Sequence, residues 1–283
     1  MNAAPTMPER RQSNLSIFSF VQGDSKGICK GDNVAVEARK GIEKQRKTRY
    51  DKGSVKATDR DVLLLTWIAE QYAARVNQVG DLMCLHPGPG AHPDGISESA
   101  VYQVVARWRK AGWVDYQQML AGEPAWVWLT RAGLAAYGLT QFKASPPAIS
   151  RLRHIYAVND VRVDIQGEED TWISERMIRA GMYQLPQTEE ETRHIPDAIL
   201  QTDKGEIVIE VELTQKKPDE LYKKMYALIH AWDQERSHYR YAGICYYTPD
   251  PRIAKALEIA REAHATGISE RRVHLVQIEL IEL

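Results

Sequence analysis

The chain has 283 residues, of which 43% are hydrophobic, and its 37 Lys and Arg against 38 Asp and Glu give a net charge of -1 at pH 7. This length and apolar content are typical of a globular protein with two domains, or with one large domain and a tail. The sequence has no run of about 18 apolar residues and no C-x-x-C pair among its three cysteines. We therefore expect a cytoplasmic protein without a membrane span, a disulfide framework or a cysteine zinc site.

Charge is distributed unevenly along the chain. Residues 1–57 contain 12 Lys and Arg and 6 Asp and Glu, whereas the rest of the chain has a net charge of -7. This first segment lacks sustained hydrophobic periodicity, so we predict a basic, mostly disordered arm over 1–57. Such an arm can bind the phosphate backbone of DNA; a solvated tail without a partner is the alternative.

Residues 58–139 combine helical patterns with the pattern of a β-hairpin. In chain order we predict a helix that Thr58 or Asp59 caps, a helix over 76–85, a helix that starts at Ser97 or Ser99 and ends at Gly112, strands over 113–119 and 125–130, and a short helix over 130–138. This order is that of a winged helix-turn-helix domain, in which the third helix enters the major groove of DNA.

The third of these helices supplies the candidate DNA contacts. Its apolar face is predicted to face the core, whereas four polar residues point elsewhere: Ser99, Gln103, Arg107 and Lys110. Glutamine can pair with adenine, and arginine can pair with guanine or a phosphate. The sequence therefore predicts double-stranded DNA as a partner; a module that only pairs with another protein is the alternative.

A second patterned region follows a short boundary. Residues 140–148 contain two prolines and small polar residues, which predicts a linker. Over 149–283 helix and strand patterns alternate: a helix over 148–166, strands over 171–178, 195–202 and 206–213, a helix over 218–236, a strand over 241–248, a helix over 251–265 and a strand over 272–280. This order predicts an α/β domain with one mixed sheet flanked by helices.

Three acids lie on two of these apolar strands, at Asp197, Glu210 and Glu212. Side chains alternate along a strand, so Glu210 and Glu212 share one face, and a hairpin would bring Asp197 beside them. Because like charges at this distance repel, the cluster predicts a cation, and carboxylates suit Mg²⁺ or Mn²⁺. Such an ion can promote phosphodiester cleavage. The alternative is an inactive, salt-bridged cluster neutralised by Arg176, Arg193 or Lys216.

The order of these motifs resembles a known nuclease superfamily. Pro196–Asp197 on one strand and Glu210–Glu212 on the next resemble the PD-(D/E)XK nucleases. Over about residues 58–283 the chain resembles the replication-relaxation family of bacterial mobile elements, through His154–Asp160, Pro196–Ala198 and Glu210–Lys216. The resemblance implies a winged helix-turn-helix followed by a PD-(D/E)XK nuclease-like mixed sheet flanked by helices.

One position departs from the superfamily pattern. Glu212 stands where the pattern has a lysine, and Lys216, four residues later, is the residue that we expect to stabilise charge on the phosphate. Two functions therefore stay open for a DNA-binding protein of a plasmid or integrated element, acting in its replication or transfer. It is either a Mg²⁺-dependent nuclease that nicks DNA, or an inactive nuclease fold that acts as a regulator or accessory factor. A homodimer and contacts with replication or conjugation proteins are further expectations.

Overall fold

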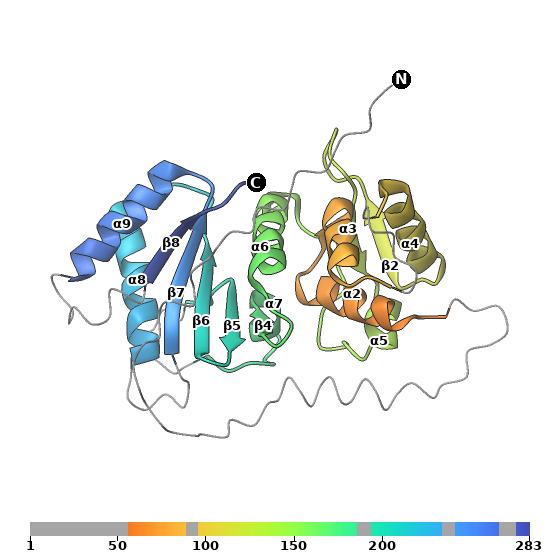
Figure 1. The fold of residues 1–283 in the computed structure, drawn as a ribbon, viewed down its shortest axis with the longest axis horizontal. Helices are drawn as coiled ribbons and strands as arrows, with labels where there is room; N and C mark the ends of the chain where they lie inside the picture. Colours follow the sequence, from red (N-terminus) through yellow and green to blue (C-terminus); the bar gives the residue numbers. More distant parts are fainter. Residues whose placement is uncertain (1–55, 89–95, 186–193, 234–240, 266–275) are drawn as a thin grey trace. The chain divides into compact units, whose positions relative to one another are not determined.

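The computed structural model describes residues 56–88, 96–185, 194–233, 241–265 and 276–283. Nearly all of the predicted basic arm (1–57), together with Arg193, therefore lies outside the described residues. The described residues all belong to one compact unit, Asp32–Leu283, and Figure 1 colours them along the sequence. No helix among them is both long enough and apolar enough to span a membrane.

The first half of the described chain joins helices to a small antiparallel sheet. Its elements are α2 (Asp59–Glu70), β1 (Ala74–Arg75), α3 (Val76–Leu85), α4 (Glu98–Lys110), β2 (Val114–Gln117), β3 (Trp126–Leu129) and α5 (Arg131–Ala136). The strands lie in the order β1-β3-β2, with Val127 between Ala74 and Tyr116. The predicted helices and hairpin are confirmed, whereas the two-residue strand β1 was not predicted.

Helix boundaries in this half follow from capping side chains. Thr58 accepts a hydrogen bond from the backbone of Asp61, whose carboxylate accepts one from the backbone of Thr58, so a capping box starts α2. Ser97, rather than Ser99, caps α4 by accepting from the backbone of Ala100. These contacts decide between the candidate caps that the sequence offered.

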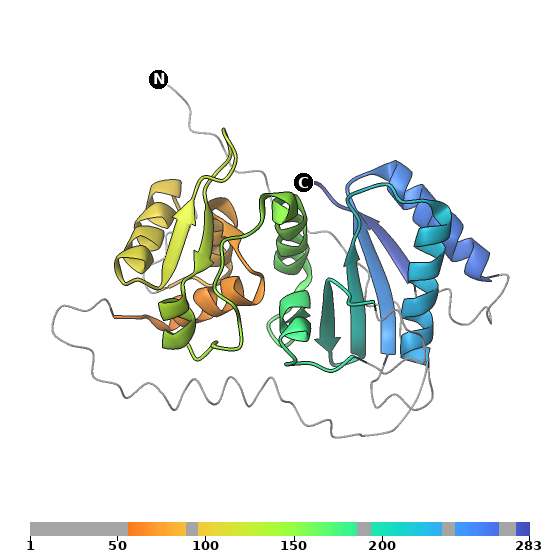
Figure 2. The same ribbon diagram turned by 180° about the vertical axis from the view of Figure 1, so that it is seen from behind.

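The second half is a mixed α/β arrangement, as predicted. Its elements are η2 (Ile149–Arg151), α6 (Leu152–Ile165), β4 (Thr171–Ser174), α7 (Glu175–Arg179), β5 (Ala198–Thr202), β6 (Gly205–Val211), α8 (Pro218–Asp233), β7 (Tyr241–Thr248), α9 (Pro251–Ala265) and β8 (Val276–Leu280). The strands lie in the order β4-β5-β6-β7-β8, antiparallel from β4 to β6 and parallel from β6 to β8. Helices α8 and α9 lie beside β7 and β8, as Figure 2 shows from behind.

The prediction of one strand over 171–178 is wrong in its second part. Strand β4 ends at Ser174, whose hydroxyl accepts a hydrogen bond from the backbone of Met177 and so caps the short helix α7. A short apolar run does not by itself distinguish a strand from a helix, and Ser174 supplies the stop that periodicity alone misses. The break places Glu175 at the start of α7, where its backbone N–H donates to the carbonyl of Asp197 at 2.9 Å.

The centre of the sheet positions two of the three acids. Ala198 on β5 pairs with Ile209 on β6, so Asp197 lies one step earlier, next to Glu210 and Val211. The backbone N–H of Val211 donates to Oδ2 of Asp197 at 2.8 Å. Strand β6 is buried along nearly its whole length and carries Glu210, whereas Asp197 directly precedes β5 and Glu212 directly follows β6.

Hydrogen bonds cross between the two halves at α6. Asn159 on α6, which is fully buried, donates to the carbonyl of Ala73 and to the side chain of Gln78. Arg162 forms an ion pair with Glu70 at 2.8 Å. The two halves are therefore joined by buried polar contacts and not only by residues 140–148.

Candidate functional site

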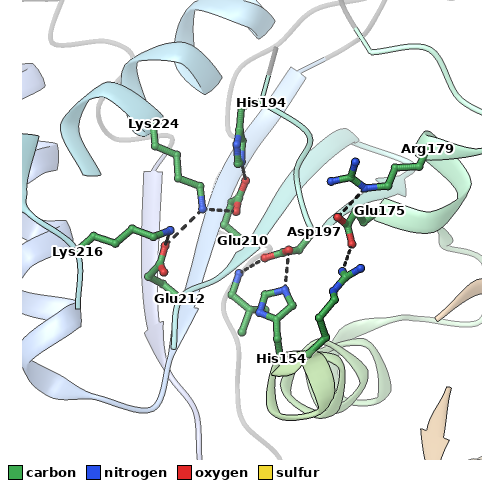
Figure 3. Close-up of polar contacts among 11 residues, drawn as sticks. His154, Glu175, Arg179, His194, Asp197, Glu210, Glu212, Lys216 and Lys224 are labelled. Atoms are coloured by element: carbon green, nitrogen blue, oxygen red, sulfur yellow. Dashed lines mark hydrogen bonds and ion pairs between the residues drawn. The ribbon is translucent and has the colours of Figure 1, made fainter. Parts of the chain in front are cut away.

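The centre of the candidate site is a pair of buried glutamates that share one lysine. Glu210 is 1% exposed and Glu212 is 3% exposed. The ammonium of Lys224, on the second turn of α8, lies 2.8 Å from Oε2 of Glu210 and 3.4 Å from Oε2 of Glu212, as Figure 3 shows. The sequence expectation that Glu210 and Glu212 share one face and attract a positive charge is thus met by a side chain.

Each glutamate has a second basic partner. Nε2 of His194 lies 2.5 Å from Oε1 of Glu210, and the ammonium of Lys216 lies 2.7 Å from Oε2 of Glu212. Lys216 is therefore an ion-pair partner of Glu212, as in the salt-bridged alternative, and its expected action on a phosphate stays a prediction. The two sides of the glutamate pair are occupied by groups from the segment before β5 and from the segment before α8.

Asp197 is held separately, by α6 and by the backbone of β6. Nε2 of His154 lies 2.8 Å from Oδ1 of Asp197, and Oδ2 accepts the hydrogen bond from Val211 (Figure 3). Burial alone would raise the pKa of the Asp197 carboxyl, but the hydrogen bond and charge of His154, with the charge of Lys224, lower it overall. Burial alone would lower the pKa of His154, because it disfavours the charged imidazolium. The hydrogen bond and the charge of Asp197 outweigh burial and raise the pKa of His154 overall.

The lysine at the centre of the cluster is strongly held in its charged form. Burial opposes the charge of Lys224, but Glu210, Glu212 and Asp197 outweigh burial and raise the pKa of Lys224 well above its ordinary value. The ammonium side chain is only 15% exposed, compared with 35% for Lys216. Lys224 is therefore the compensating charge that Glu210 and Glu212 share.

Glu175 lies outside this cluster. Its carboxylate forms ion pairs with Arg151 and with Arg179, the latter at 2.8 Å (Figure 3). A small pocket between Glu175, Arg151, His154 and Tyr72 borders Asp197, and its volume of about 20 Å³ suits a single water. We expect this pocket to be a solvated margin of the site, since charges of both signs line it.

The three acids, as arranged, do not fit a metal ion. Among the residues that the structure describes, no group of three or more His, Cys, Asp or Glu is placed to hold one. Carboxylates are suitable ligands for Mg²⁺, but both oxygens of Asp197 and both oxygens of Glu210 already have protein partners. Of the three basic partners proposed from sequence for a salt-bridged cluster, Lys216 takes part. Arg176 instead donates to the carbonyls of Ala69 and Lys143.

The candidate DNA contacts lie along α4. Three of these candidates are exposed: Ser99, Gln103 and Lys110. Together with Ala106 they follow the spacing i, i+4, i+7 and i+11, which forms one stripe along a helix. The opposite face of α4 carries the buried residues Val101, Val105 and Trp108. The structure thus brings three of the four predicted contacts together on one exposed face.

Arg107, the fourth predicted contact, is held by the first helix. Its guanidinium forms an ion pair with the fully buried carboxylate of Asp61, which also accepts a hydrogen bond from Nε1 of Trp108 at 2.7 Å. Arg109, which was not predicted, is more exposed and lies 3.6 Å from Asp115. The helical periodicity of the sequence could have identified Arg109 as an exposed position of α4. No local signal in the sequence pairs Arg107 with Asp61.

Lys224 is the residue that the sequence reasoning missed at the carboxylate site. It lies twelve residues after Glu212 and on the next helix, so no spacing rule for one strand or one helix connects the two.

Comparison with known proteins gave no matching family model, no matching curated protein and no matching solved structure.

Proposed function

We propose that this chain is a DNA-binding regulator or accessory factor that contacts double-stranded DNA through α4, with a nuclease-like second half that does not catalyse cleavage. The element order of the first half, with the β2–β3 hairpin following α4, supports its use as a winged helix. The resemblance noted in the sequence suggests a role in replication or transfer of a plasmid or integrated element, as a homodimer or beside replication or conjugation proteins.

The observation that carries the DNA-binding proposal is the stripe of Ser99, Gln103 and Lys110 on the exposed face of α4. A helix whose other face is anchored by buried Val105 and Trp108 can present such a stripe rigidly to a groove. Glutamine offers a donor and an acceptor to a base edge, and lysine offers a charge to a phosphate. The stripe therefore combines a group that can read sequence with a group that can add affinity.

The observation that favours a non-catalytic second half is charge compensation. Four basic side chains face the acids at hydrogen-bonding or ion-pairing distance: Lys224, Lys216, His194 and His154. A buried carboxylate whose oxygens are already paired with a lysine contributes to the fold and not to cleavage, because those oxygens are not available to a metal ion.

The test is a fluorescence anisotropy titration of duplex DNA, after selection of a preferred site from a randomised library. We expect Lys110→Ala to weaken binding to every duplex and to lower the slope of log K against log salt by about 1. Gln103→Ala should relax the preference at one base position by about 1–3 kcal/mol. Lys223→Ala, at an exposed position of α8, is the matched control. If Lys110→Ala and Gln103→Ala both bind as the wild type and the control do, α4 is not the DNA contact.

A second candidate function, Mg²⁺-dependent nicking of DNA, is favoured by one observation. The register of β5 and β6 puts Asp197 directly beside Glu210, as a shared carboxylate site requires. For Asp197, Glu210 and Glu212 to hold the ion, with Lys216 facing the phosphate, His154, His194 and Lys224 would first have to release the oxygens that they contact. The test is incubation of supercoiled plasmid with Mg²⁺ or Mn²⁺. Nicking by the wild type that is lost in Asp197→Ala would establish this function, and intact plasmid in both metals would exclude it.

A further inference from the structure

We propose that the ammonium of Lys224 is the resident cation of the carboxylate cluster, and that it excludes a divalent ion from Glu210 and Glu212. The proposal concerns the second half alone and does not depend on whether α4 binds DNA. It gives the departure at Glu212 a physical meaning: the acid that stands in place of a lysine, directly after β6, contacts a lysine that α8 supplies.

The geometry singles out Lys224 among the neighbouring cations. Its ammonium bridges both glutamates, at 2.8 Å and 3.4 Å, whereas Lys216 and His194 each contact only one of them. Asp197 adds its charge to the same ammonium and helps to keep Lys224 protonated. One side chain thus compensates a site to which three acids contribute.

Burial explains why this ammonium would be hard to displace. Glu210 and Glu212 are almost fully buried, and the side chain of Lys224 is 15% exposed, so the three charges interact with little screening by water. A divalent ion between the glutamates would lie within a few ångströms of the ammonium and would be repelled by it. To bind Glu210, the ion would also have to displace Lys224 from Oε2 or His194 from Oε1.

The position of Lys224 also ties α8 to the end of β6. Leu221, Met225 and Leu228 of α8 are buried and fix the helix, so the ammonium is presented by a packed element and not by a loose side chain. We therefore expect removal of Lys224 to have two effects at once. The fold loses stability, and the freed acids gain affinity for a divalent ion.

The experiment is a comparison of thermal unfolding and calorimetric titration with Mn²⁺ for five proteins. These are the wild type, Lys224→Met, Lys223→Met, Asp197→Asn and the double variant Glu210→Gln/Lys224→Met. Lys223→Met is the matched control, because Lys223 is the exposed neighbour of Lys224 on the same helix. The double variant removes both charges of the closer of the two contacts that Lys224 makes, which keeps a folded reference available if Lys224→Met alone is too unstable to study.

We expect Mn²⁺ to leave the Tm of the wild type and of Lys223→Met unchanged. Lys224→Met should unfold at a lower temperature, and saturating Mn²⁺ should raise its Tm by about 5 °C. The double variant should be more stable than Lys224→Met and should respond much less to Mn²⁺. Mn²⁺ binding by the wild type that is lost in Asp197→Asn would overturn the proposal. So would a double variant that is no more stable than Lys224→Met, since the two charges would then be uncoupled.

Discussion

The guanidinium of Arg107 is the cation that faces the fully buried carboxylate of Asp61, and it reaches from α4 to the first turn of α2. The same carboxylate oxygen accepts the indole N–H of Trp108, and the other takes part in the capping box of α2. A residue that the sequence predicts as a DNA contact thus joins α4 to the first turn of α2.

We predict that Arg107→Ala lowers the free energy of unfolding by about 2 kcal/mol, because it leaves a buried carboxylate with fewer partners. Arg109→Ala is the control: Arg109 is mostly exposed and 3.6 Å from Asp115, so we expect a change below about 0.5 kcal/mol. Urea unfolding followed by circular dichroism measures both. Equal stability of the two variants would show that the Arg107–Asp61 pair is not structural.

The contact between His154 and Asp197 predicts a pH-dependent contribution to stability. The folded pKa of His154 is raised above 6.5, so its contribution is complete below that pH and is lost as the pH rises through the folded value. The folded pKa of Asp197 is lowered below 3.8, so its contribution is complete above that pH and is lost as the pH falls through the folded value. The pair therefore stabilises the fold most between these two reference values.

We expect His154→Gln to lower the free energy of unfolding most near pH 5, with a difference from wild type that shrinks above pH 7. Chemical unfolding at pH 5, 7 and 8.5 measures this. Arg153→Gln, at the exposed neighbouring position, is the control. A difference for His154→Gln that is constant with pH would mean that the contact is not charged.

Asp160, at the contact between α3 and α6, predicts a pH dependence of stability opposite in sign to that of Asp197. Burial raises the pKa of Asp160 to about 6, against the hydrogen bond that Gln78 donates to it at 2.6 Å. Because the folded carboxyl retains its proton longer than the unfolded one, stability falls as the pH rises from 3.8 to about 6. We predict that Asp160→Asn raises the free energy of unfolding at pH 7 by about 1–3 kcal/mol. Unfolding at pH 4 and pH 7 checks this: a variant that is less stable than wild type at both would contradict it.

The position of Gly133, near the start of α5, leaves no room for a side chain. A Cβ at this position would lie 1.9 Å from the carbonyl oxygen of Trp113, a backbone atom that already accepts the N–H of Thr130. We expect Gly133→Ala to lower stability by about 3 kcal/mol or more, because β2 or α5 must shift. Gly112→Ala, with a φ of +75° but open space around it, should lower stability by only about 1 kcal/mol. The Tm of each variant measures the difference.

The fold was predictable from the sequence where local signals act alone. The bounds of α3 match the prediction, and Thr58 and Ser97 were among the candidate caps of α2 and α4, because caps and periodicity lie within one element. The start of α7 was missed because Ser174 follows a run that suits a strand equally well.

The candidate site was predictable only in part. The strand pattern and the hairpin turn placed Asp197, Glu210 and Glu212 near one another, and the register of β5 and β6 agrees. The partners of these acids were not predictable, since His154 and Lys224 come from helices on either side of the strands in the chain. Such contacts depend on how helices pack on the sheet, which neither spacing nor periodicity encodes.

The hydrogen bonds that Asn159 and Arg162 make to the first half have a consequence for dividing the protein. Cleavage within 140–148 followed by separation of the two pieces would expose the Gln78 amide and leave Glu70 without its arginine. Neither piece is then expected to behave as an autonomous folding unit, and a first half transplanted from another protein would have to match the surface of α6.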